Sequence, residues 1–117
     1  MDEHLKAAGH ALEALDAESL VGLYVDGFVF EDTAAGLVIS TREELAAYFK
    51  ALFSMPDVGF SEVSFFRCGN RGAGTWRWSG ANRLGDPYSV RGASVFDLVE
   101  GGIRREAVFY DPRPARG

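Results

Sequence analysis

The sequence has a single cysteine, Cys68, and no long uninterrupted apolar stretch. One cysteine excludes an internal disulfide, which is typical of a reducing compartment. No apolar run approaches the ~20 residues that a membrane-spanning helix needs. Acidic residues outnumber basic ones, 17 to 12, and the net charge of −5 argues against nucleic acid as the main partner. The chain starts acidic and lacks the basic stretch of a signal peptide. We therefore expect a cytoplasmic protein with no membrane partner.

Motifs for cofactors and metals are also missing. No glycine-rich phosphate loop follows a strand, and there is no nucleophile elbow. The two histidines, His4 and His10, lie six residues apart and on different faces of a predicted helix, so we do not expect a metal pair. The pattern favours chemistry without cofactor or metal. His10 lies near the predicted pocket and is a secondary acid–base candidate.

Aromatic residues are plentiful, with nine Phe, four Tyr and two Trp in 117 residues. A chain of this length that is 47% hydrophobic and 25% charged folds as one globular domain, here residues 1–117. So many rings can either fill the core or line a cavity.

Residue periodicity predicts helices before strands. Apolar residues at helical spacing predict three helices, at residues 3–15, 16–26 and 42–54. Alternation of apolar and polar residues predicts five strands, at residues 28–32, 59–68, 74–82, 88–99 and 103–110. We read residues 34–40 as a loop and 112–117 as a frayed tail. Helices followed by antiparallel strands indicate an α+β fold, whose bent sheet and helices form a cone with a pocket at its open end.

Three segments carry a resemblance to a known family. Residues 23–32 (Leu-Tyr-Val-Asp-Gly-Phe-Val-Phe-Glu-Asp), residues 36–45, and residues 91–104 with 109–111 resemble the nuclear transport factor 2-like (NTF2-like) superfamily. Within it, the chain resembles the SnoaL-like polyketide cyclases and the ketosteroid isomerases. The resemblance implies a cone-shaped, cystatin-like fold, with three N-terminal helices packed on a strongly bent, mainly antiparallel sheet. The superfamily includes isomerases, cyclases, hydrolases, dehydratases and binding proteins, so it predicts the fold better than the reaction.

The resemblance also marks catalytic candidates. Asp32 falls where ketosteroid isomerases keep their proton-shuttling Asp. It follows the inward-facing Phe28 and Phe30, so partial burial would suit it as a base; alternatively, it is an ordinary turn-former. Ala11 and Ser94 stand where those isomerases place their oxyanion donors, so we expect weak or no steroid isomerisation.

The last strand supplies a second set of candidates. The resemblance favours Arg104, Glu106, Val108 and Tyr110 facing the pocket, with Glu106 as the second carboxylate and Tyr110 beside it. An alternative for Glu106 is a salt bridge on a solvated face. The side chains expected to contact the substrate are Tyr24, Phe30, Tyr48, Phe49, Trp76, Trp78, Ser94 and Phe96. Core packing would equally explain the tryptophans.

These residues predict cofactor-free acid–base chemistry on a hydrophobic small molecule with a carbonyl group, such as isomerisation, enolisation or aldol-type cyclisation. Asp32 would be the base, Glu106 would assist, and Tyr24, Ser94 or Tyr110 would hold the carbonyl oxygen. The alternative is a non-catalytic ligand-binding or assembly domain of the same fold. We also expect a homodimer through the outer sheet face, with Arg and Asp meeting across the interface.

Overall fold

The computed structural model describes residues 3–117. Its helices and strands follow one another as α1 (Glu3–Glu13), α2 (Ala17–Val21), β1 (Tyr24–Asp32), β2 (Leu37–Ile39), α3 (Arg42–Phe53), β3 (Gly59–Cys68), β4 (Arg71–Ala81), β5 (Pro87–Val99), β6 (Gly102–Phe109) and α4 (Arg113–Arg116).

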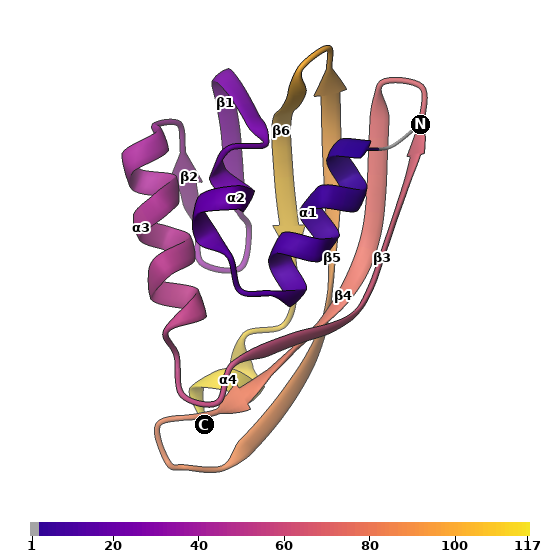
Figure 1. The fold of residues 1–117 in the computed structure, drawn as a ribbon. Coiled ribbons are helices and arrows are strands. Elements are labelled where there is room, and N and C mark those ends of the chain that lie inside the picture. Colours follow the sequence, from indigo (N-terminus) through magenta and orange to yellow (C-terminus); the bar gives the residue numbers. More distant parts are fainter. Residues whose placement is uncertain (1–2) are drawn as a thin grey trace.

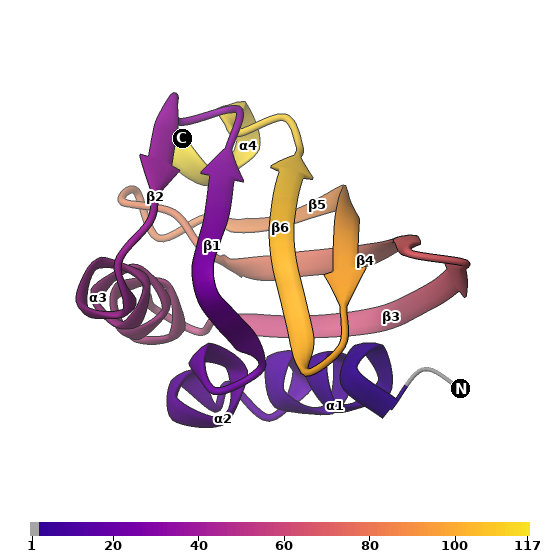
Figure 2. The ribbon, with the colours of Figure 1, turned by 90° about the horizontal axis from the view of Figure 1, so that it is seen from above.

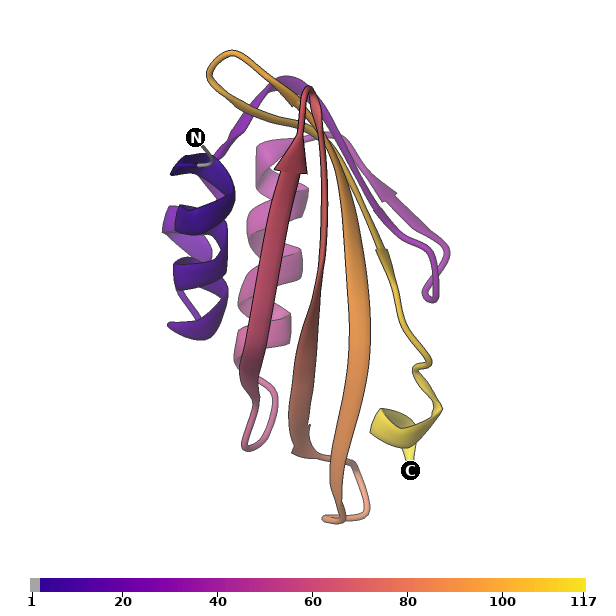
Figure 3. The same ribbon diagram turned by 90° about the vertical axis from the view of Figure 1, so that its right-hand side faces the viewer.

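The strands form one six-stranded sheet in the order β2-β1-β6-β5-β4-β3. Neighbouring strands are antiparallel except for β1 and β6, which run parallel. Helices α1, α2 and α3 lie on one side of the sheet (Figures 1 and 3), and the sheet curls over them (Figure 2). The arrangement confirms the predicted α+β fold.

The second helix ends earlier than the sequence predicted. Its start is as expected, since the Asp16 carboxylate accepts from the Ser19 backbone N–H at 3.1 Å. It stops at Val21, however, and Tyr24 already belongs to β1. The Ile103 N–H donates to the Leu23 carbonyl at 2.9 Å, so pairing with β6 draws these residues into the sheet.

Two short elements were missed. Residues 34–40, predicted as a loop, contain β2, in which Ile39 pairs with Phe30 of β1. Three residues are too few to show alternation, and only the partner strand fixes them. The predicted frayed tail contains α4, where the Asp111 carboxylate accepts from the backbone N–H of Arg113 at 3.0 Å.

A bulge changes which side chains of β6 face inward. The register between β5 and β6 shifts so that Arg105 lies opposite Asp97 but Ile103 lies opposite Leu98. Ile103 is therefore fully buried and Arg104 is exposed. The prediction that Arg104 faces the pocket is wrong, because strict alternation does not hold across a bulge.

Buried aromatic residues fill the space between helices and sheet. Phe28 and Phe30 of β1 are 2% and 1% exposed. At the start of α3 the Thr41 hydroxyl caps the helix, accepting from the Glu44 N–H at 3.2 Å. The Glu44 carboxylate in turn accepts from the Thr41 hydroxyl at 3.0 Å.

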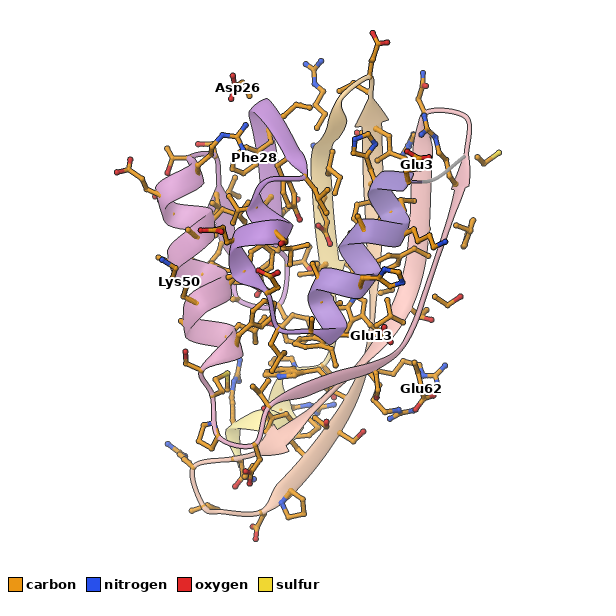
Figure 4. All side chains as sticks on the ribbon, viewed as in Figure 1. Glu3, Glu13, Asp26, Phe28, Lys50 and Glu62 are labelled. Atoms are coloured by element: carbon orange, nitrogen blue, oxygen red, sulfur yellow. The ribbon has the colours of Figure 1, made fainter. Side chains whose placement is uncertain are left out.

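Charged side chains gather on the outside. Asp26, Lys50 and Glu62 lie at the edges of the molecule as seen in Figure 4. Within residues 3–117, no helix has the length and apolarity needed to cross a bilayer. The interior is thus left to aromatic rings and the few polar groups described next.

Candidate active site

A cavity of about 60 Å³ lies between the helices and the inner face of the sheet. More than half of the side chains around it are aromatic. All eight residues predicted to contact the substrate belong to this lining. The lining consists of Ala8, Leu12, Leu20, Tyr24, Phe30, Tyr48, Phe49, Leu52, Phe60, Phe65, Trp76, Trp78, Ser94, Phe96, Glu106, Val108 and Tyr110.

Glu106 is the carboxyl group that lines this cavity. It projects from β6, is 8% exposed, and accepts a hydrogen bond from the Tyr24 hydroxyl. The Ser94 hydroxyl also bonds to it and accepts from the Trp76 indole N–H at 2.9 Å. Trp76, Ser94, Glu106 and Tyr24 therefore form one buried hydrogen-bonded chain across β4, β5, β6 and β1.

Burial gives Glu106 unusual proton affinity. Desolvation raises its pKa to about 7, while the hydrogen bonds from Tyr24 and Ser94 act in the opposite direction. The alternative of a salt bridge on a solvated face does not apply, since Glu106 is buried and its hydrogen-bond partners are hydroxyl groups. Near neutral pH both the acid and the base form are present.

Asp32, at the end of β1, is 2% exposed but lies behind the cavity wall rather than in it. Its Oδ2 accepts from the Tyr48 hydroxyl at 2.7 Å and from the Tyr110 hydroxyl at 2.9 Å. Its Oδ1 accepts from the Ala35 backbone N–H at 3.1 Å. Both oxygens are used as acceptors, and the two phenols stand between the carboxylate and the cavity.

The two carboxyl groups belong to one electrostatic unit. Phe30, two residues before Asp32, pairs with Glu106 across the parallel strands. Burial raises the pKa of the Tyr48 hydroxyl far above its ordinary value, and the charges of Asp32 and then Glu106 add to the effect. The pKa of Tyr24 and that of Tyr110 are likewise raised, chiefly by burial. These phenols stay neutral and act as donors.

A glycine in β5 shapes the aromatic wall. A Cβ on Gly92 would lie 2.1 Å from the Trp76 ring, so only glycine lets that indole lie across β5. The Tyr110 ring then contacts both tryptophans, with centroids 6.1 Å from Trp76 and 5.7 Å from Trp78. Gly92 thus makes room for a ring.

The pairing of acids with particular tyrosines could not be read from the sequence. Tyr48 and Tyr24 were expected to contact substrate, but their hydroxyls are occupied by Asp32 and Glu106. The register of β1 places Tyr24 opposite Ile103 and not opposite Glu106, so the sequence contains no local signal for this contact. His10 lines a separate polar groove between α1 and β3, away from both acids.

Metal binding has no support in the part of the chain that the structure describes. No three His, Cys, Asp or Glu side chains between residues 3 and 117 are grouped as metal ligands. The chemistry that this arrangement can do on its own is proton transfer at Glu106.

Residues 6–106 match the SnoaL-like domain family, and the chain belongs to that family. No curated protein matches it in sequence. Solved structures, by contrast, share its fold. A hypothetical protein of Catenulispora acidiphila with a ketosteroid isomerase-like fold, solved in complex with trimethylamine, has a TM-score of 0.85 at 17% identity. The match covers 98% of this chain and 90% of that one.

Two further neighbours carry functional names. A candidate polyketide cyclase of Xanthomonas campestris has a TM-score of 0.80 at 16% identity, covering 93% of this chain and 88% of its own. A candidate ketosteroid isomerase of Kribbella flavida has a TM-score of 0.75 at 14% identity, covering 91% and 73%. At these identities the likeness shows the NTF2-like fold, as the sequence resemblance predicted, and leaves the reaction open.

Proposed function

We propose that this protein is a small-molecule enzyme that moves a proton on an apolar carbonyl compound without a cofactor, with Glu106 as the proton carrier. The observation that carries the proposal is the position of Glu106 in an aromatic cavity with a pKa of about 7. A base of that pKa can take a proton from the carbon next to a carbonyl at neutral pH and return it at another position. Such transfer is the common step of enolisation, isomerisation and aldol-type cyclisation.

Asp32 takes a different role in this proposal. Sequence patterns pointed to it as the base, but its oxygens already accept three hydrogen bonds and it stands behind Tyr48 and Tyr110. We assign Asp32 the positioning of those two phenols, and Glu106 the transfer of the proton. Tyr24 would hold the Glu106 carboxyl in one orientation.

The substrate is small. A cavity of about 60 Å³ holds only a few heavy atoms. All three phenols around it donate to carboxyl groups, so among the described residues the Trp78 indole N–H is the donor of the lining that has no partner. A single neutral N–H stabilises an oxyanion less than two strong donors do. We therefore expect weak or no isomerisation of a 5-ene-3-ketosteroid. Efficient turnover of that steroid would count against both the size and the donor argument.

Proton transfer can be tested without knowing the product. Incubation with small ketones and hydroxyketones in D₂O should exchange their α-protons, followed by NMR. We expect exchange to rise with pH around a midpoint near 7, where Glu106 ionises. Ketone binding without any exchange over background would instead favour the second reading, a ligand-binding domain. The trimethylamine in the Catenulispora neighbour supports a pocket that takes small molecules in either reading.

We also propose that two copies pair through the outer sheet face. Val95 and Phe109 are 42% and 47% exposed there, and an apolar patch of this kind favours a two-fold contact. The expected ion pairs across the interface need revision, because Arg71 already binds Asp97 within one chain. Sedimentation at micromolar concentration should show a dimer that Phe109→Asp weakens. A monomer for the unmodified protein would overturn the pairing.

A further inference from the structure

The cavity and its wall contain two acids and no base. Asp32 and Glu106 are 2% and 8% exposed, and the lining includes no Lys, Arg or His. Among the described residues, Arg116 of α4 is exposed at the surface and acts on the cavity only through a weak lowering of the Tyr110 pKa. Buried acids without a counter-ion give such a space a negative potential.

The walls add to the same preference. Ring faces are electron-rich and attract a cation placed within ~6 Å of a ring centre. Three rings lie close together on one wall: the Tyr110 ring centroid is 6.1 Å from that of Trp76 and 5.7 Å from that of Trp78. The phenol protons all point at the carboxylates, so an anion or a carbonyl oxygen finds little to accept from them.

We infer that the cavity is a site for a small alkylammonium group, held between the aromatic wall and Glu106. By volume, one water needs ~10–15 Å³, so a cavity of about 60 Å³ fits a group the size of tetramethylammonium. The inference rests on the proposed function only in taking this cavity as the ligand site. In a substrate with both groups, the ammonium would offset the charge of the enolate that Glu106 generates, a charge for which the lining offers only the unpartnered Trp78 N–H.

Cation binding is tied to the protonation of Glu106. A bound cation favours the ionised carboxylate, so affinity should rise with pH through the pKa of Glu106, about 7. The titratable groups that face it are the phenols of Tyr24 and Tyr48, with Asp32 behind Tyr48. Helices α1 and α2 contribute only uncharged side chains, Ala8, Leu12 and Leu20.

The test compares two ligands of one shape and different charge, tetramethylammonium and tert-butanol, by NMR titration. At pH 8 we expect the cation to bind about tenfold more tightly than tert-butanol. This is the scale of one favourable contact of a cation with an aromatic ring or with a carboxylate. At pH 5.5 the preference should shrink to about threefold or less, because protonated Glu106 is neutral. Glu106→Gln is neutral at every pH, so at pH 8 it should weaken binding of the cation by about threefold or more, down to the preference seen at pH 5.5, and change tert-butanol binding by less than about twofold.

Glu31→Gln is the matched control. Glu31 precedes Asp32 on the same strand but faces outward and pairs with Arg105 at 3.2 Å, so its loss removes one charge without touching the cavity. Equal affinity for the two ligands, or cation binding that Glu106→Gln leaves intact, would overturn the inference. Cation binding without α-proton exchange supports the inference while rejecting the proposed enzyme. Exchange on neutral ketones with no cation binding rejects the inference alone.

Discussion

The two faces of the sheet treat acidic residues in opposite ways. On the outer face, Glu31, Glu62 and Asp97 each lie within salt-bridge distance of an arginine, and their side chains are 35%, 58% and 43% exposed. On the inner side, Asp32 and Glu106 are buried and are held by hydroxyl groups and one backbone N–H. Glu31 and Asp32 are neighbours in sequence, yet strand alternation sends them to these two environments.

The kind of partner decides what each acid can do. Each of the outer acids has an arginine and water beside it, and both stabilise a carboxylate charge. Neutral hydroxyls do not cancel the charge of the inner ones, so burial dominates and raises the pKa of Glu106 to about 7. Reactivity therefore belongs to the inner face, and paired variants of inner and outer acids can test this.

The largest expected effect is on catalysis. Glu106→Gln removes the proton carrier and should lower α-proton exchange by ~10²-fold or more, the usual scale for a lost general base. Glu31→Gln, its outer-face counterpart, should change the rate by less than about twofold, since its side chain faces Arg105 and water. NMR exchange rates at pH 8 give both numbers. Similar rates for the two variants would move the base elsewhere.

The next effect is on stability against pH. The folded protein holds the Glu106 proton up to about pH 7, whereas the unfolded chain releases it near 4.5. Because the folded state binds more protons in this window, the free energy of unfolding should fall as pH rises from about 4.5 to 7, by on the order of 3 kcal/mol. Urea unfolding at pH 4.5 and pH 8 measures this difference.

Glu106→Gln should flatten that pH dependence. At low pH the variant and the parent protein should have equal free energies of unfolding. At pH 8 the variant should have the higher one, because it has no buried charge at residue 106. Glu62→Gln on the outer face serves as the control and should leave the slope unchanged, because Glu62 is largely exposed beside Arg77. A parent protein whose stability does not decline between these pH values would contradict a raised Glu106 pKa.

A smaller effect is expected behind the cavity wall. Tyr48→Phe and Tyr110→Phe each remove one hydroxyl from Asp32 and should destabilise the fold by ~1–2 kcal/mol, because a buried carboxylate loses a partner. The double variant should lose less stability than the sum of the two single losses, if water enters the space left by the hydroxyls.

Asp32→Asn should slow α-proton exchange, because the two phenols that Asp32 positions would shift. An exchange rate equal to that of the unmodified protein would remove Asp32 from the site.

How far the sequence leads can be judged from particular residues. Ser94 and Phe96, which the sequence analysis expected to contact the substrate, are both buried on the inner face of β5. The family resemblance, which favoured Arg104 facing the pocket, was wrong there, because the bulge opposite Asp97 depends on the pairing of two strands. Residue alternation missed β2, which exists only through β1.

The candidate site shows the same division. Residue type and family resemblance pointed to Asp32, Glu106 and Tyr110, all of which the fold brings to the same region. Which tyrosine serves which acid depends on side chains from α3, β1 and the end of β6 meeting in space. That convergence, and the raised pKa of Glu106 that follows from burial, needed the structure.

The smallest effect is expected for the outer ion pairs themselves. Glu62 meets Arg77 at 2.9 Å and Arg91 at 3.4 Å, with all three side chains partly or largely exposed. Such pairs contribute below ~1 kcal/mol in water and weaken with salt. Arg91→Gln should therefore shift the free energy of unfolding only slightly, and the shift should vanish in 1 M NaCl. A loss above ~2 kcal/mol that persists in high salt would mean that this face is shielded from water, as it would be if two copies paired through it. Sedimentation of the same samples would then show whether a dimer is present.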